Sequence, residues 1–277
     1  MRGEKLGLQY DQQPGGYFVM SGAYGTSGGC GMSLRLDDGG SLRAPAESWA
    51  LDPKSSTHGF QFLEVKGKQL LYTADMGTDS IWTHAVENSG AVSEVDRLRF
   101  SMPGVKPRFI EIHPNGKYIY VVLDHVNSIT ALPMSDSGKV HEKNDQRVWP
   151  LIPDGADSEQ YWSAVLALSP DTQHLWATTR GKKDNVGYIS GFRLDKKGSI
   201  VERMFRVPTN STGTMTSSLT VALWSDEHAL YGDAPGGFLA VLKLVPDMET
   251  KGGLTAVVVA KLEIGSGKCC SNALWLD

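Results

Sequence analysis

The feature that most constrains the fold is an internal repeat of a strand, a turn and a second strand. One copy covers residues 113–124 and another covers residues 169–180, and the two match position by position. An earlier copy covers residues 65–75, and a weaker later copy covers residues 224–233. The period is roughly 50 residues, which is typical of propeller blades. The 3.6-residue period of an α-solenoid is not found in these segments.

The first three copies are each followed by a third strand rich in aromatic or β-branched residues and then by a turn that contains glycine. These third strands start at Ser80, Ser128 and Tyr188. Four short strands in each repeat predict the blades of a β-propeller. The sequence therefore predicts an all-β fold, with residues 1–277 forming a single β-propeller domain and any active site at the centre of its ring.

The two ends of the chain fit the repeat less well. Residues 16–42 look like the last strands of a blade whose beginning is missing, and residues 271–277 look like the first strand of another blade. Propellers usually join their first and last segments in one blade, because an open edge strand would pair with other chains. The domain is therefore expected to be incomplete at its N-terminal end.

Charge and hydropathy exclude several kinds of partner. A net charge of -4 with no cluster of Lys and Arg argues against nucleic acid. No apolar stretch approaches the roughly 18 residues of a membrane span. The charged residues 1–5 are followed by no apolar segment, so no signal peptide is predicted and the chain as given would be cytoplasmic. Secretion stays open if the true N-terminus is missing, and only then would the sequon at Asn210 matter.

Three cysteines are too few for a disulfide framework. Cys30 could pair with Cys269 or Cys270, but three unpaired thiols are the favoured interpretation. No zinc-binding spacing of His or Cys occurs, so neither a bound metal nor a cofactor is predicted, although calcium held by scattered carboxylates is not excluded. A nucleophile elbow is absent, and the Gly-Ser-Gly-Lys sequence at residues 265–268 lacks the rest of a phosphate loop.

The candidate site follows from equivalent positions in the repeat, because the innermost strand of every blade faces the central channel. His58 and Arg108 each come immediately before the first strand of a blade. Asp75, Asp124 and Arg180 share one position after the second strand. A histidine, two arginines and one or two carboxylates that converge on a channel could orient an anionic or polar small molecule and transfer a proton.

Each of these residues also has a structural alternative. His58 could cap a turn, and Arg108 could join two blades through a salt bridge. Asp75 is the weakest candidate, because an aspartate at the end of a strand often caps the following turn through the backbone. For Asp75 the structural interpretation is favoured.

Eight motifs together resemble one known family, and the resemblance covers most of the chain. They are Thr57-His58-Gly59, Tyr72-Thr73-Ala74-Asp75, Ile81-Trp82-Thr83-His84, Lys106-Pro107-Arg108-Phe109 with His113-Pro114, Pro150-Leu151-Ile152-Pro153, Gly187 to Phe192, Trp224-Ser225-Asp226-Glu227, and Asn272-Ala273-Leu274-Trp275.

The chain resembles the fungal carboxy-cis,cis-muconate cyclase family, seven-bladed propellers related to the lactonase-type propellers. The resemblance implies a catalytic group of His58, Arg108, Asp124 and Arg180, in which Asp124 stands where the family has glutamate. It also implies that about two N-terminal blades are absent, so residues 1–277 would not close a seven-bladed ring by themselves.

The sequence departs from the family pattern in two segments that are expected to contact the substrate. Tyr161-Trp162-Ser163-Ala164 stands where the family carries two charges, and Met215-Thr216-Ser217 stands where it carries His-Ser-Asn. Both changes favour a larger, flatter and less polar ligand, with Tyr161, Trp162 and Asp75 as substrate-binding residues.

A second branch that resembles this family is the fungal hetero-Diels-Alderases of tropolone sesquiterpenoid pathways. Our first hypothesis is therefore an enzyme of secondary metabolism that joins a tropolone quinone methide to a polyene such as humulene. The alternative is a lactonising carboxy-cis,cis-muconate cyclase of aromatic catabolism. A second alternative is a non-catalytic propeller that binds protein partners on its faces. The oligomeric state is not predicted.

Overall fold

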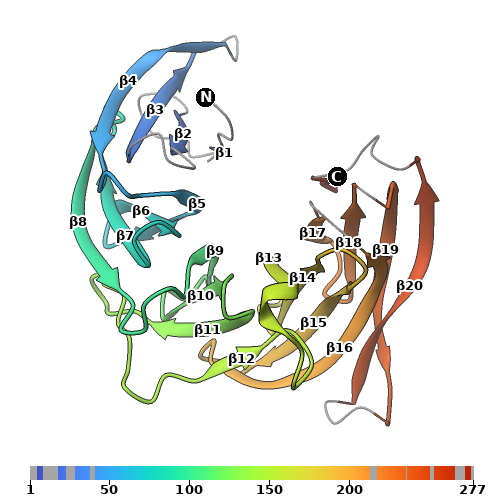
Figure 1. The fold of residues 1–277 in the computed structure, drawn as a ribbon. Coiled ribbons are helices and arrows are strands. Elements are labelled where there is room, and N and C mark those ends of the chain that lie inside the picture. The colour runs from blue at the N-terminus through green and yellow to red at the C-terminus, as the bar shows by residue number, and fades with distance from the viewer. Residues whose placement is uncertain are drawn as a thin grey trace. The chain divides into compact units, whose positions relative to one another are not determined.

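A computed structural model describes residues 5–8, 18–22, 29–37, 41–212, 217–234, 236–249, 253–265 and 272–275. The strands within them form five antiparallel sheets of four strands, and each sheet is built from strands consecutive in the sequence (Figure 1). The predicted all-β fold of four-stranded blades is confirmed. The chain divides into two compact units, Met1–Ile119 with Leu132–Asn144 and Tyr120–Ala131 with Asp145–Asp277.

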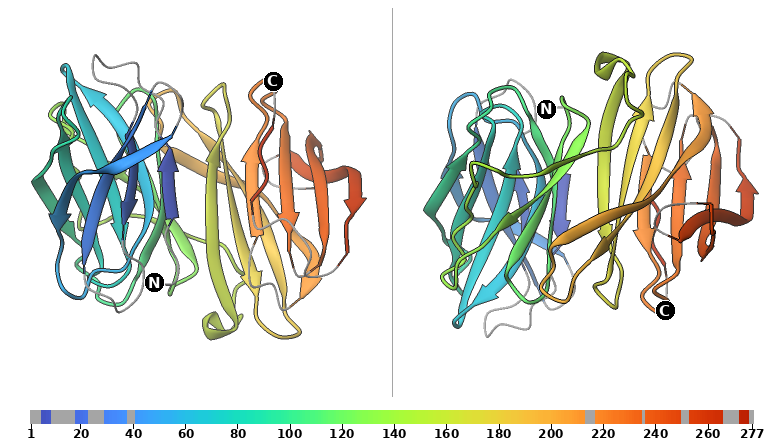
Figure 2. Two further views of the ribbon diagram at one scale, coloured as in Figure 1. Left: turned by 90° about the horizontal axis from the view of Figure 1, so that it is seen from above. Right: turned by 90° about the horizontal axis from the view of Figure 1, so that it is seen from below.

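The first unit contains two complete sheets. Their strands are β1 (Lys5–Leu8), β2 (Phe18–Gly22), β3 (Cys30–Leu36) and β4 (Leu42–Ala50), then β5 (Thr57–Val65), β6 (Lys68–Asp75), β7 (Ser80–Val86) and β8 (Val92–Arg99). The sheets lie side by side, with β5 near β1 and β8 near β4 (Figure 2). In each sheet the strands follow their order in the chain.

The start of the chain corrects one prediction. Residues 16–42 were expected to open in the middle of a blade, but β1 pairs with β2 over four residues and supplies the first strand of that sheet. Sequence reasoning missed β1 because it is only four residues long and matches no copy of the repeat. The sheet that contains these residues therefore has all four of its strands.

The division between the units falls within the third sheet, whose strand order is β12-β11-β10-β9. Its strands are β9 (Pro107–Ile112), β10 (Tyr118–Leu123), β11 (Ser128–Pro133) and β12 (Val148–Pro150).

The turn between β9 and β10 has the same backbone conformation as the aligned turn between β13 (Tyr161–Leu168) and β14 (His174–Gly181), which supports the repeat alignment. Gly116 in this turn has φ +68°, and Thr172, which aligns with it, has φ +59°. Because a side chain crowds the backbone in this region, Thr172 costs about 1 kcal/mol or more relative to glycine.

The second unit contains two complete sheets that also lie side by side, with β17 near β13 and β20 near β16 (Figure 2). The elements are the one-turn helix η1 (Ser158–Gln160), β13 (Tyr161–Leu168), β14 (His174–Gly181), β15 (Val186–Leu194) and β16 (Ile200–Thr212), then β17 (Ser217–Val221), β18 (His228–Asp233), β19 (Phe238–Pro246) and β20 (Leu254–Glu263).

The end of the chain corrects another prediction. Residues 272–275 were expected to belong to a strand, but they form none in the structure. They attach to the edge of β17 through two hydrogen bonds. Thr220 Oγ1 donates to the carbonyl of Ala273 at 2.8 Å, and Trp275 Nε1 donates to the carbonyl of Thr220 at 3.2 Å.

Candidate functional site

His58 lies in a bulge of the first strand of its sheet. In the β5–β6 ladder Thr57 pairs with Asp75 and Phe60 pairs with Thr73, so β5 carries one extra residue at His58 and Gly59. Such bulges change the direction of a side chain and are common beside active sites. His58 and Arg108 are both the second residue of their strands, so they lie one residue inside β5 and β9 rather than before them.

His58 and Arg108 are in direct contact within the first unit. Arg108 Nε donates a hydrogen bond to His58 Nε2 at 3.1 Å, so this ring nitrogen carries no proton in this arrangement. His58 is buried and Arg108 is partly buried. Gly59 allows the two strands to approach, because a Cβ at this position would lie 2.9 Å from the carbonyl oxygen of Arg108. The two residues hold near-equivalent positions in the repeat and are neighbours in the structure, while their catalytic role stays a prediction.

Sequence reasoning missed Glu111, which lies on β9 of the same unit. Gln61 Nε2 on β5 donates to Glu111 Oε2 at 3.3 Å. Burial raises the pKa of Glu111 to about 8, and a hydrogen bond from the Ile112 backbone N–H opposes this only in part. At neutral pH Glu111 is therefore mainly a neutral acid and a potential proton donor. A Glu flanked by two isoleucines in a strand, three residues after Arg108, was the available signal.

Asp75 does not present its carboxylate to a ligand. It is fully buried and accepts five hydrogen bonds, two from the turn that follows it and three from Ser55, Ser56 and Trp82. The donors are Ser55 Oγ at 2.6 Å, Ser56 N at 2.7 Å, Gly77 N at 3.0 Å, Thr78 Oγ1 at 2.5 Å and Trp82 Nε1 at 2.9 Å. These bonds support the structural interpretation of Asp75, in which its carboxylate binds neighbouring donors and not a ligand. We therefore leave Asp75 out of the candidate site.

Asp124 has different partners from Asp75, although the two share a repeat position. Asp124 Oδ1 accepts a hydrogen bond from Ser163 N at 2.8 Å, on the first strand of the following sheet. Ser163 Oγ in turn donates to Asn127 Oδ1 at 3.1 Å. The β13–β14 ladder is bulged between Ser163 and Leu166, as β5 is beside His58. Within the second unit this hydrogen bond holds Asp124 beside Ser163, on the bulged strand β13.

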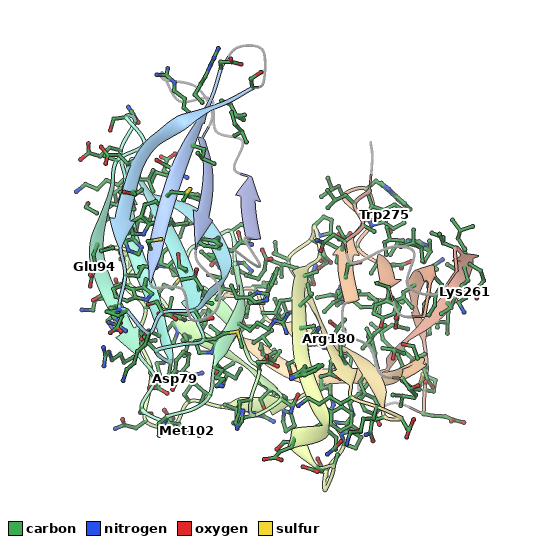
Figure 3. The ribbon with its side chains drawn as sticks, turned by 45° about the horizontal axis from the view of Figure 1, so that its top comes forward. Asp79, Glu94, Met102, Arg180, Lys261 and Trp275 are labelled. Carbon is green, nitrogen blue, oxygen red and sulfur yellow. The ribbon has the colours of Figure 1, made fainter. Side chains whose placement is uncertain are left out.

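Arg180 also lies at the start of β13. It is the cross-strand partner of Trp162, and its guanidinium carbon lies 5.3 Å from the centroid of the Trp162 ring. Arg180 is buried on β14, where Figure 3 labels it, while Trp162 is partly buried. Lys182 Nζ approaches the same ring at 4.5 Å. Trp162, Arg180 and Asp124 are therefore gathered about one strand end within the second unit.

Tyr161, the neighbour of Trp162, is buried and packs differently. Its ring centroid lies 6.0 Å from that of Tyr188. Burial, together with Tyr188, raises the pKa of Tyr161 above its ordinary value. Tyr161 thus offers little free surface, and of the two aromatic candidates Trp162 is the better placed to meet a ligand.

The structure brings the predicted residues together as two groups, one in each unit. His58 and Arg108 form the first, and Asp124, Arg180 and Trp162 form the second. The convergence of both groups on one ligand stays a prediction.

Met215 and Thr216 lie outside the described residues, as do Cys269 and Cys270, while Cys30 is exposed. Among the placed residues, no group of three or more His, Cys, Asp or Glu could hold a metal ion. None of the placed helices is long and apolar enough to cross a membrane.

The repeated sheets of four antiparallel strands have the architecture of β-propeller blades. The chain belongs to the lactonase, 7-bladed β-propeller family, which it matches over residues 4–213.

Known relatives are distant cyclases and lactonases. The chain is 26% identical to the carboxy-cis,cis-muconate cyclase of Neurospora crassa over 94% of its own length and 71% of that protein's. It is 26% identical to muconate cycloisomerase 1 of Cutaneotrichosporon cutaneum over 54% of this chain and 41% of that one. A solved structure of a putative 6-phosphogluconolactonase from Bacteroides fragilis aligns with a TM-score of 0.71 at 17% identity, over 94% of this chain and 70% of that one. This last likeness concerns the fold alone.

Proposed function

We propose that the protein is an enzyme that forms or opens a lactone on an unsaturated polycarboxylic acid, as a carboxy-cis,cis-muconate cyclase does. The observation that carries the proposal is the hydrogen bond from Arg108 Nε to His58 Nε2. It places an unprotonated ring nitrogen beside a permanent cation, as proton transfer next to a bound carboxylate requires. Relatives named as a cyclase and a cycloisomerase support the same chemistry.

The reaction is an isomerisation and needs no co-reactant. In lactone formation a carboxylate oxygen of the substrate bonds to a carbon of the conjugated double bond. The electron pair moves toward the other carboxylate, and the α-carbon takes up a proton. The developing negative charge would be stabilised by Arg108 or Arg180. In the opening direction Arg108 Nε would turn from His58 Nε2 to the substrate carboxylate, and the freed Nε2 would accept the proton from the α-carbon. In the forming direction the protonated ring would return this proton, and Nε2 would again accept the hydrogen bond from Arg108.

Cycloaddition on a tropolone is the second candidate, and Trp162 is the observation that favours it. Its partly buried indole offers a flat face with two cations nearby, which suits a planar anionic ring as well as an open-chain acid. The relatives named above are all cyclases or lactonases, and for this reason we place the muconate type of reaction first. This reverses the order expected from the sequence, in which cycloaddition came first.

The test is a substrate comparison with the purified protein. We expect loss of the diene absorbance of carboxy-cis,cis-muconate, with the lactone identified by NMR. His58→Ala and Arg108→Gln should each lower the rate by roughly 10²-fold. His125→Ala is the matched control, because His125 is exposed, and it should leave the rate unchanged.

Other substrates decide between the alternatives. Turnover of a hydroxymethyl tropolone with humulene, and none of the muconate, would put cycloaddition first. Hydrolysis of 6-phosphogluconolactone alone would indicate a lactonase. Inertness toward all three would favour the non-catalytic binding propeller.

A further inference from the structure

Lys182 is a charged residue beside the candidate site that the resemblance does not assign. It follows the end of β14 and is partly buried. Two hydrogen bonds fix its position against the turn of η1, since its backbone N–H donates to the carbonyl of Gln160 at 2.8 Å and Nζ donates to the carbonyl of Glu159 at 2.6 Å. The ammonium group is thereby held 4.5 Å from the centroid of the Trp162 ring.

Two cations thus share one indole. The guanidinium carbon of Arg180 lies 5.3 Å from the Trp162 ring centroid, so both charges are within the range of a cation–π interaction. Bringing two like charges to one aromatic ring costs free energy unless negative charge compensates them. The indole face compensates them only in part.

The ammonium group of Lys182 keeps hydrogen-bonding capacity that its neighbours do not use. Its Nζ donates to a backbone carbonyl, that of Glu159, and in the placed part of the chain Lys182 forms no salt bridge. The carboxylate of Asp124 accepts the backbone N–H of Ser163, the residue after Trp162.

We propose that Lys182 and Trp162 form a subsite for a carboxylate on a planar, conjugated acid. A lysine ammonium has three N–H donors, of which one is directed to the carbonyl of Glu159. The others can bind a carboxylate while the flat part of the ligand stacks on the indole. This inference rests on the proposed function and narrows its substrate class. Lys182 would determine specificity for acids with an additional carboxylate and would take no part in proton transfer.

The experiment measures binding of unreactive aromatic acids, so that its outcome does not depend on turnover. Calorimetric titrations compare benzene-1,2,4-tricarboxylate with benzoate on the wild-type protein, Lys182→Gln and Lys182→Arg. The matched control is Lys183→Gln, because Lys183 is the exposed neighbour of Lys182. We expect Lys182→Gln to bind the tricarboxylate about tenfold more weakly, on the scale of a charged hydrogen bond. Benzoate binding should change much less, Lys182→Arg should retain most of the affinity, and Lys183→Gln should behave as wild type.

The inference is overturned if Lys182→Gln binds the tricarboxylate as tightly as wild type, if Lys183→Gln weakens it equally, or if wild type does not bind the tricarboxylate. A tenfold loss in Lys182→Gln supports the subsite even if the wild-type protein converts no muconate. In that case the proposed function fails and the subsite stands, so the two failures are distinguishable.

Discussion

Asp75→Asn separates a structural role from a catalytic one. The carboxylate is fully buried and accepts five hydrogen bonds, three of them at Oδ2 and two at Oδ1. An asparagine retains one oxygen and replaces the other with an NH₂ group. In the least costly orientation the amide nitrogen takes the Oδ2 position, where the hydroxyls of Ser55 and Thr78 can rotate to accept from it. The indole N–H of Trp82 cannot do so and loses its acceptor.

The cost follows from these partners. A buried donor without an acceptor costs about 1–3 kcal/mol, and loss of the charge weakens the remaining bonds further. We expect Asp75→Asn to lower the free energy of unfolding by about 2–4 kcal/mol. KM for the substrate should stay unchanged, because no part of the carboxylate is exposed. Asp75→Ala removes the acceptor for all five donors and should cost more.

The assay is urea unfolding followed by circular dichroism, with KM measured on the folded fraction. Asp136→Asn is the control, since its carboxylate is 76% exposed and its partner Lys117 is 55% exposed. Such a surface ion pair is worth at most about 1 kcal/mol. The reasoning is refuted if Asp75→Asn is no less stable than Asp136→Asn, or if it raises KM at unchanged stability.

The remaining predictions concern pH and backbone fit. Burial lowers the pKa of His84 to about 4, so its contribution to stability is lost as the pH falls from 6.5 through 4. The raised pKa of Glu111, about 8, gives a contribution that is full below pH 4.5 and is lost as the pH rises through 8. The two trends oppose each other between pH 4.5 and 6.5. The free energy of unfolding should therefore fall between pH 6.5 and 8, by at most about 1.4 kcal/mol per pH unit. Glu111→Gln should abolish this fall in urea titrations, and a fall that persists in the variant would disprove the assignment. Gly59→Ala should lower kcat/KM by displacing β9, because its Cβ would meet the backbone of Phe109 at 3.0 Å and of Arg108 at 2.9 Å. Unchanged kinetics would show that the strand spacing does not control the pair.

The repeat explains why much of the fold could be predicted from the sequence. The turn at Gly116 recurs in the copy at residues 169–180, where Thr172 keeps the left-handed backbone conformation of the aligned glycine, and apolar strands flank the turn in both copies. Repeat position identified His58 and Arg108 as near-equivalent, and they are neighbours in the structure because each is the second residue of adjacent first strands, β5 and β9. The four-residue strand β1 could not be found in this way, since it carries no turn or apolar pattern of the repeat.

Repeat position did not predict the bonding of each side chain. Asp75 and Asp124 share a position, yet Asp75 accepts donors from its own sheet and from the residues just before β5, whereas Asp124 accepts a backbone N–H from the following sheet. The difference arises from neighbours that the alignment does not compare, namely Ser55, Thr78 and Trp82 around Asp75. Glu111 was missed for a similar reason, because its raised pKa comes from burial against β5 and not from any motif.

The central claim is that Arg108 and His58 together bind and act on a polycarboxylic acid, and a crystal structure with bound benzene-1,2,4-tricarboxylate tests it most directly. The measurement is the distance from ligand oxygens to the guanidinium nitrogens of Arg108. We predict that a ligand carboxylate lies within hydrogen-bond distance of Arg108, about 2.7–3.2 Å, and that the ligand also contacts the ring of His58. A ligand that binds with no carboxylate at Arg108, or without contact to His58, would contradict the claim.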